Sequence, residues 1–185
     1  MTRSISEMLS SFTTDLARPA RFDVVIHLPN GLISNQTLGG NGLSTSDSQI
    51  LSLRCEAAEF PSRSFATAEQ KFGSNPIEKY PYQTIYNDMT LTFIVSGDMK
   101  EKKIFDAWMN IVMPIDNFNP QYKYTGFSPN YTTPIYIAQY DATGQERHHV
   151  TLQDAYPISV NQLDLDWSSD GFHKLSVVFA YTYFI

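Results

Sequence analysis

Apolar and polar residues alternate along most of this chain, and a period of two is typical of a β-strand that turns one face to a core. The alternation is clearest near the carboxyl end, where every second residue from Leu175 to Tyr183 is apolar or aromatic. The same pattern begins at four earlier positions: Phe22, Leu51, Met89 and Leu163. The sequence therefore predicts a mainly β fold, an antiparallel β-sandwich or barrel.

Two more strands are expected at Ile135–Asp141 and Arg147–Asp154. Between them stands Ala142-Thr143-Gly144, and its glycine can adopt the positive φ that a tight turn requires. This segment is predicted to be a β-hairpin.

One long helix is expected to interrupt the strands. Asp98 and Glu101 are suited to cap its start, and Pro114 is suited to end it. Its apolar residues recur at helical spacing: Ile104, Phe105, Trp108, Ile111 and Val112. We expect this helix to flank the sheets and to cover one open end or face of them.

A short amphipathic helix is expected near the amino end. Ser4 and Glu7 form a capping box, and Pro19 is expected to end the helix. Its apolar stripe consists of Ile5, Met8, Leu9 and Phe12.

Two segments do not fit the regular strand pattern. Pro29–Asp47 is rich in Gly, Asn, Ser and Thr around Gly39-Gly40-Asn41-Gly42, and we expect a flexible loop insertion there. Pro61–Tyr86 combines strand-like alternation with aromatic and charged residues, which predicts a long hairpin. Such a hairpin needs a second surface to bury its apolar side chains.

The chain has 185 residues, enough for one domain, and we expect a single domain over 1–185. A single cysteine, Cys55, excludes an intramolecular disulfide and a multi-cysteine zinc site. The apolar runs are too short for a membrane helix, and no secretory signal is expected. The net charge of −6 argues against binding to the phosphate backbone of nucleic acids.

Candidate chemical groups are few. His148 and His149 are neighbours on a predicted strand, so they point to opposite faces and cannot share one ion. Cys55 lies in the apolar register and is expected to be an inert, buried thiol. Asp164 and Asp166 share a strand face that is expected to be open, whereas a catalytic carboxylate pair needs burial. We therefore predict no catalytic residue, no metal, no cofactor and no enzymatic activity.

Several blocks appear in an order that is similar to one known family. They are Ala17-Arg18-Pro19, the run from Leu53 to Pro61, Asp88–Phe93, Phe105–Trp108, Tyr156-Pro157 with Val160, Leu163–Trp167 and Val177–Tyr183. In this order the chain resembles the tail tube proteins of contractile-tailed bacteriophages. The Pro29–Asp47 insertion is longer than the turn usual in that family.

The resemblance implies a β-sandwich subunit that forms hexameric rings, which stack into a hollow tail tube inside a contractile sheath. The implied partners are other copies of the chain, the sheath protein, and baseplate and terminator proteins. DNA would pass through the lumen without specific binding, and the subunit would not insert into a membrane. The implied location is the virion tail, after synthesis in the host cytoplasm.

The long hairpin is the expected contact between subunits, and its candidate interface residues are Phe65, Phe72, Tyr80, Tyr82 and Tyr86. Asp164 and Asp166 are expected to face the channel or a subunit contact. An acidic wall suits a channel for DNA, because a cationic wall would capture phosphates.

Three alternatives remain open at this point. The same fold could serve as a single-ring tube initiator or tail terminator, or as a tube subunit of a type VI secretion system. A monomeric β-sandwich that binds a ligand or acts on sugars is the third. Self-assembly separates the first two from the last.

Overall fold

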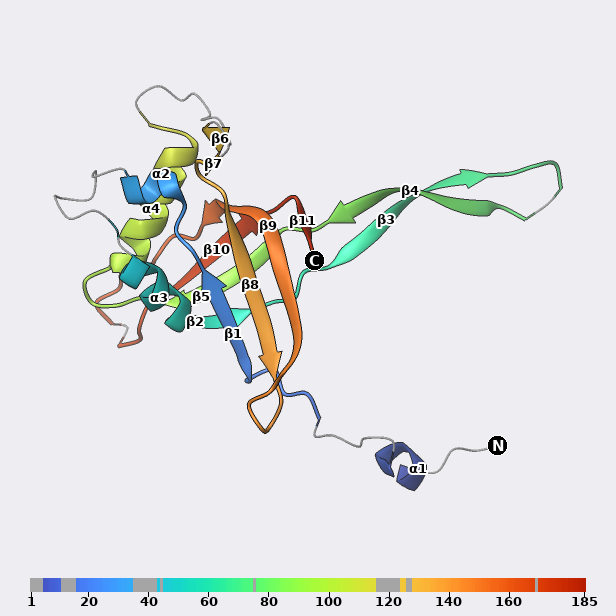
Figure 1. Cartoon of the computed structure of the whole chain (residues 1–185), viewed down its shortest axis with the longest axis horizontal. Helices are drawn as coiled ribbons and strands as arrows, with labels where there is room; N and C mark the ends of the chain where they lie inside the picture. Colours follow the sequence, from blue (N-terminus) through green and yellow to red (C-terminus); the bar gives the residue numbers. More distant parts are fainter. Residues whose placement is uncertain are drawn as a thin grey trace.

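In the computed structural model, seven strands form one bent sheet in the order β1-β8-β9-β10-β5-β2, with β11 paired to β9 (Figure 1). The structure describes residues 5–10, 16–34, 43, 45–74, 76–115, 124–125, 128–168 and 170–185. The strands are β1 Phe22–Ile26, β2 Cys55–Ala58, β3 Arg63–Gln70, β4 Glu78–Tyr86, β5 Met89–Ile94, β6 Tyr124–Thr125, β7 Ser128–Pro129, β8 Thr133–Tyr140, β9 Glu146–Val160, β10 Lys174–Ala180 and β11 Tyr183–Phe184. The helices are α1 Ile5–Ser10, α2 Asn30–Ser34, α3 Thr45–Leu53 and α4 Lys100–Val112. All pairs in the sheet are antiparallel, which confirms the predicted fold class.

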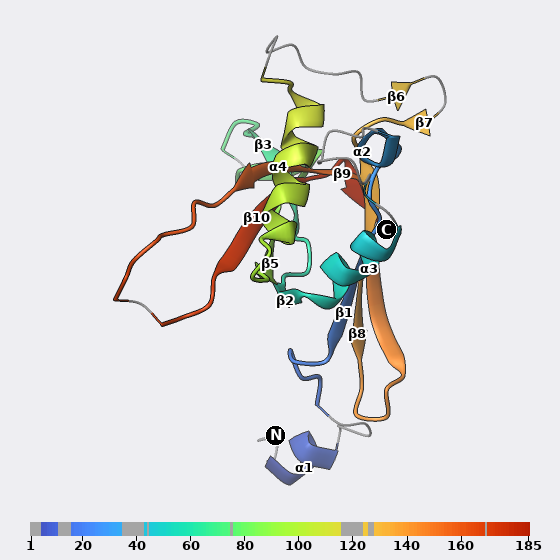
Figure 2. The same ribbon diagram turned by 90° about the vertical axis from the view of Figure 1, so that its left-hand side faces the viewer.

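The long strand β9 joins the two halves of the sheet. Its first part pairs with β8 as far as Ala155, and its last part, from Tyr156, pairs with β10. Asp154, just before this change of partner, has a φ of 56°, which non-glycine residues rarely adopt. The strand changes partner here, so the halves β1-β8-β9-β11 and β9-β10-β5-β2 turn their apolar faces to one core (Figure 2).

The core consists of the side chains that the alternation placed on one face. In β10, for example, Leu175, Val177 and Phe179 are fully buried while the residues between them are half-buried. Buried apolar residues alternate in the same way in other strands: Val24, Ile26, Met89, Leu91, Phe93, Ile135, Ile137, Val150 and Leu152.

Helix α4 covers this core, as the sequence predicted. The Phe105 ring centre lies 5.1 Å from that of Phe93, and the Trp108 ring centre lies 6.0 Å from that of Phe179. The buried indole Nε1 of Trp108 donates a hydrogen bond of 2.7 Å to the carbonyl of Tyr131. Burial of these large rings is the main stabilisation of the helix on the sheet.

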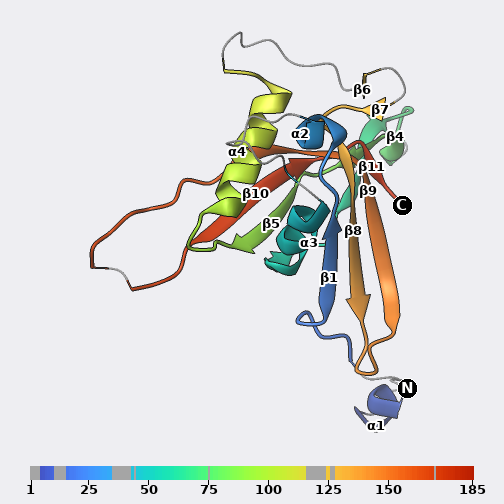
Figure 3. The same cartoon turned by 60° about the vertical axis from the view of Figure 1, so that its left-hand side comes forward.

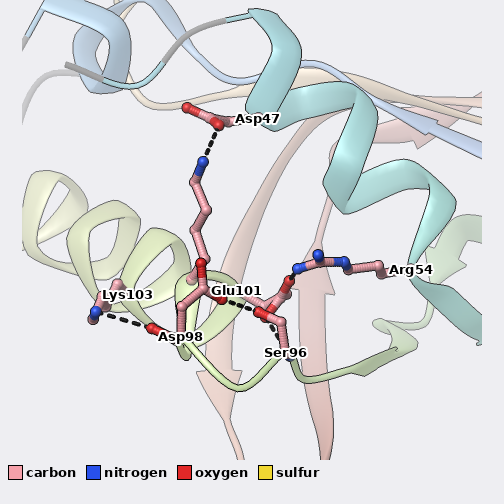
Figure 4. A network of polar contacts seen from close by, with 7 residues as sticks. Asp47, Arg54, Ser96, Asp98, Glu101 and Lys103 are labelled. Atoms are coloured by element: carbon pink, nitrogen blue, oxygen red, sulfur yellow. Dashed lines mark hydrogen bonds and ion pairs between the residues drawn. The ribbon is translucent and has the colours of Figure 1, made fainter. Parts of the chain in front are cut away.

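The start of α4 differs from the expected cap. Met99 precedes the helix in the left-handed region, with a φ of 56°, and no side chain caps it. Glu101 instead reaches back and accepts hydrogen bonds from the Ser96 backbone N–H (2.9 Å) and hydroxyl (2.8 Å) (Figure 4). Asp98 accepts a hydrogen bond from the same hydroxyl, so both carboxylates fix the turn before the helix.

The same carboxylate ties α4 to α3. Glu101 is 1% exposed and pairs with Arg54, the residue that follows α3 (Figure 4). One residue earlier on α4, Lys100 pairs with Asp47 in the first turn of α3. A buried carboxylate is stable only with such partners, so this network fixes how the two helices meet.

Helix α3 corrects a prediction. The alternation from Leu51 to Ala57 predicted one strand, but residues 45–53 are helical and only Cys55–Ala58 is a strand. On a helix, neighbours two apart face opposite sides, and accordingly Leu51 is buried while Leu53 is 83% exposed. A short apolar run with period two does not distinguish these states.

Helices also occupy both ends of the expected loop insertion at 29–47, as α2 and the start of α3. The run Gly39–Gly42 lies outside the described residues. Near the amino end, α1 covers Ile5–Ser10, and residues 16–18 just before Pro19 are not helical, while residues 11–15 lie outside the described part of the chain. The β8–β9 hairpin is confirmed, and Gly144 has the expected positive φ, 78°.

Replacement of Glu101 by alanine tests the network. The change removes the carboxylate that holds Arg54 and Ser96, and we expect the free energy of unfolding to fall by about 3 kcal/mol. Asp106→Ala, on the same helix, removes only an exposed pair with Lys102 and should lower it by about 0.5 kcal/mol or less. Urea unfolding of both variants measures the difference, and equal losses would contradict the account.

Candidate assembly surface

Strands β3 and β4 form a two-stranded hairpin that extends far from the body (Figure 1). Neither strand pairs with another strand in the described part of the chain. The pairing runs from Arg63 opposite Tyr86 to Gln70 opposite Glu78. A register shift after Ala66 leaves Tyr82 as an extra residue, a β-bulge that increases the local twist. The hairpin predicted over 61–86 is confirmed.

Apolar side chains lie on both faces of this hairpin. Phe65 and Tyr86 belong to one face, and Tyr80 and Ile85 belong to the other, since paired residues share a face. A hairpin on the surface of a monomer normally turns one polar face to water. An isolated two-stranded ribbon is marginally stable at best, so this one is suited to bury both faces in a contact.

Four of the five residues predicted for a subunit interface are exposed. The exposed fraction is 55% for Phe65, 67% for Phe72, 46% for Tyr80 and 69% for Tyr82. Two further apolar residues of the hairpin, Ile77 and Ile85, are also exposed and were missed by the sequence prediction. The sequence shows both isoleucines within the hairpin segment, but only the register of the strands shows which face Ile85 belongs to.

Tyr86, the fifth residue, lies half-buried at the base of the hairpin. Its ring centre is 5.4 Å from that of Phe184 in β11 and 6.2 Å from that of Tyr181. The amide of Asn87 also donates to the Ser62 hydroxyl across the base, at 2.8 Å. These contacts hold the root of the hairpin on the body while its outer part projects.

The charges on the hairpin are partly matched. Lys79 and Glu69 pair across the strands at 3.2 Å, and the hydroxyl of Tyr80 donates to Glu78. Arg63 lies 5.6 Å from the ring centre of Phe65. Arg63, Lys71 and Glu78 form no ion pair within the described residues, so the hairpin presents two unpaired cations and one unpaired carboxylate beside its aromatic rings.

The connection between β9 and β10 is a second projecting segment (Figures 2 and 3). The strand predicted around Leu163–Trp167 is wrong, because β9 ends at Val160 and the next strand begins at Lys174. Of the expected apolar face, Leu163 packs partly against the core, whereas Leu165 and Trp167 are 86% and 107% exposed.

Asp164 and Asp166 lie in this connection and are exposed. Asp166 accepts hydrogen bonds from the Ser168 backbone N–H (3.0 Å) and hydroxyl (2.8 Å), and these bonds lower the pKa of its carboxyl. The structure therefore gives Asp166 a turn-forming role. That these carboxylates face a channel stays a prediction.

The edge strand β1 is protected by α3. The Ser52 hydroxyl accepts a hydrogen bond of 3.0 Å from the N–H of Ile26, and the Ser48 hydroxyl donates to the carbonyl of Ile26. Side chains thus satisfy the outward backbone groups at this end of the strand.

The family model for phage tail tube proteins matches residues 17–185 of this chain. The chain belongs to the phage tail tube protein family. The resemblance predicted from the order of sequence blocks is thereby confirmed. A comparison with curated proteins finds no match.

Solved structures share the fold of this tail tube protein at low sequence identity. A chain in the cryo-EM structure of the anti-feeding prophage cap, the tube terminating cap, has a TM-score of 0.62 and 17% identity over 94% of this chain and 91% of the other. A second similar chain belongs to the PVC sheath/tube terminator of an extracellular contractile injection system in the extended state. Its TM-score is 0.61 and its sequence identity is 16%, over 94% of this chain and 97% of the other. A chain in the PVC sheath–tube complex has a TM-score of 0.55 and 16% sequence identity, over 100% of this chain and 97% of the other.

The chemical groups of the tail tube protein are dispersed. Among the described residues, no group of three or more His, Cys, Asp or Glu is placed to hold a metal ion. His148 and His149 contact different rings, Phe60 at 5.2 Å and Tyr136 at 5.3 Å between ring centres. No helix in the described ranges has the length and apolar character to cross a membrane.

The reactivity of Cys55 tests whether its thiol is shielded in the folded protein. Cys55 is half-buried rather than fully buried as expected, and this burial raises the pKa of its thiol to about 12, so the thiol is protonated at pH 8. We expect labelling by a thiol reagent at that pH to be at least about a hundredfold slower in the folded tail tube protein than in denaturant. Equal labelling rates would show that the thiol is accessible and ionised.

Proposed function

We propose that this protein is the structural subunit of an inner tail tube, in which hexameric rings stack inside a contractile sheath. The observation that carries the proposal is the β3–β4 hairpin, with aromatic side chains exposed on both faces. Family membership supports the tube, and the shared fold with components of contractile injection systems supports the sheath and baseplate as partners.

The role is mechanical rather than catalytic. A closed ring of identical subunits buries strand edges and apolar hairpins that would otherwise lead to aggregation. A bore lined by acidic residues does not retain a polyanionic genome by counterion release, and the net charge of −6 supports such a lining. We propose that the tube conducts the genome from the virion into the host.

Variants of the hairpin test this function. Phe65→Asp combined with Tyr82→Asp places charge on two exposed rings, and we expect rings and tubes to be lost while the folded monomer remains. Phe65→Tyr combined with Tyr82→Phe keeps the aromatic surface and should assemble like the natural protein. Negative-stain electron microscopy with sedimentation velocity measures the result.

Normal tubes from the Asp variants would refute the hairpin as the assembly surface. Because both positions are exposed, thermal unfolding of the two variants should match that of the natural protein.

A second candidate is a terminator that forms one ring at the end of a tube. Two of the chains that share the fold come from structures of a tube terminating cap and of a sheath/tube terminator, which supports this candidate. The length of the polymers separates the two roles, since a tube subunit forms open-ended tubes and a terminator forms single rings.

A further inference from the structure

We infer that the β9–β10 loop of one copy, residues 161–168 and 170–173, docks on the β3–β4 hairpin of a second copy. The inference rests on the proposed assembly and names the two surfaces that meet. It is carried by the apolar side chains and the opposite charges of these two segments.

The loop presents large apolar side chains to solvent. Trp167 is fully exposed, Leu165 is 86% exposed and Phe172 is 63% exposed. Together with Asp164, Asp166, Gly171 and His173 they line an open hollow of about 410 Å³. Tryptophan is the residue most enriched among the anchors of protein interfaces, and a hollow beside it can receive a ring of the partner.

Contacts shape the turn of the loop and anchor its root. The two hydrogen bonds from Ser168 to Asp166 fix the turn that carries Trp167. At the root, Lys174 lies 5.3 Å from the ring centre of Phe172 and pairs with Glu56 of β2 at 2.6 Å. A turn and a root that are formed before binding lose less conformational entropy on docking.

The charges select the partner surface. Asp164, Asp166 and Asp170 lie within the loop, which has no Lys or Arg, and none of the three forms an ion pair in the described chain. The hairpin carries Arg63 and Lys71 without carboxylate partners, beside exposed aromatic rings. Over residues 63–86 the hairpin carries three cations against the carboxylates Glu69 and Glu78, so its net charge is +1. An acidic, aromatic loop and a slightly basic, aromatic hairpin are complementary in both charge and apolar character.

The two segments of one copy do not meet. The loop and the hairpin leave the body on different sides (Figures 1 and 3). Contact between them therefore joins two copies through different surfaces, which is a heterologous interface. Interfaces of this kind repeat from copy to copy and generate closed rings or continuous stacks.

Charge reversal tests the inference. One variant combines Asp164→Lys, Asp166→Lys and Asp170→Lys, and another combines Arg63→Glu and Lys71→Glu. We expect each variant to raise the protein concentration needed for assembly by about tenfold or more, because like charges then face each other. A protein with all five changes should recover most of the assembly, and Trp167→Ala in the natural background should lose it. Sedimentation velocity at a fixed salt concentration measures all four, with thermal unfolding as the folding control.

Natural assembly by the three-lysine loop variant or by Trp167→Ala would overturn the inference and leave the proposed function intact. Disruption by both charge variants without recovery in the combined protein would also overturn it, since the two surfaces would then contact something else. If the natural protein itself forms no rings or tubes, the proposed function fails first.

Discussion

The β3–β4 hairpin has apolar side chains on both faces, and the body of the same chain does not bury them. The rest of the structure is best understood from this constraint. The body ends where Tyr86 packs against Phe184, and beyond that point the rings of Phe65 and Tyr82 are exposed to solvent. Each large side chain of this kind stabilises a contact by about 1.5–3 kcal/mol when it is buried. The hairpin therefore provides binding energy that only another molecule can realise.

The body supplies a rigid base for this surface. Packing of Phe105 and Trp108 on the sheet fixes α4, and the buried Glu101 network fixes α3 against α4. Strand β9 connects the part of the sheet that carries β11 to the part that carries the projecting loop, so the root of the hairpin and the loop share one framework. A fixed geometry between two docking surfaces is what a closed ring requires, because errors in orientation accumulate from copy to copy.

Period-two alternation predicted the strands of the body because every second side chain there meets a common core. It failed at two places, once in a projecting loop and once in a short helix. Leu165 and Trp167 alternate with acids in a loop, and Leu51 and Leu53 lie on opposite sides of a helix. The exposed rings of the hairpin could be predicted from composition and length, whereas Ile85 and the bulge at Tyr82 required the strand register. Contacts between distant segments, such as Glu101 with Arg54, have no local signal in the sequence.

Amide hydrogen exchange of the hairpin, compared between the monomer and the assembled protein, tests the central claim most directly. Residues 64–70 and 78–85 have no second layer in the monomer, so we expect their exchange to slow by about tenfold or more on assembly. The buried strand β10 should be protected to the same degree in both states and serves as the internal reference. Equal exchange of the hairpin in monomer and assembly would contradict the claim that other copies of the chain cover it.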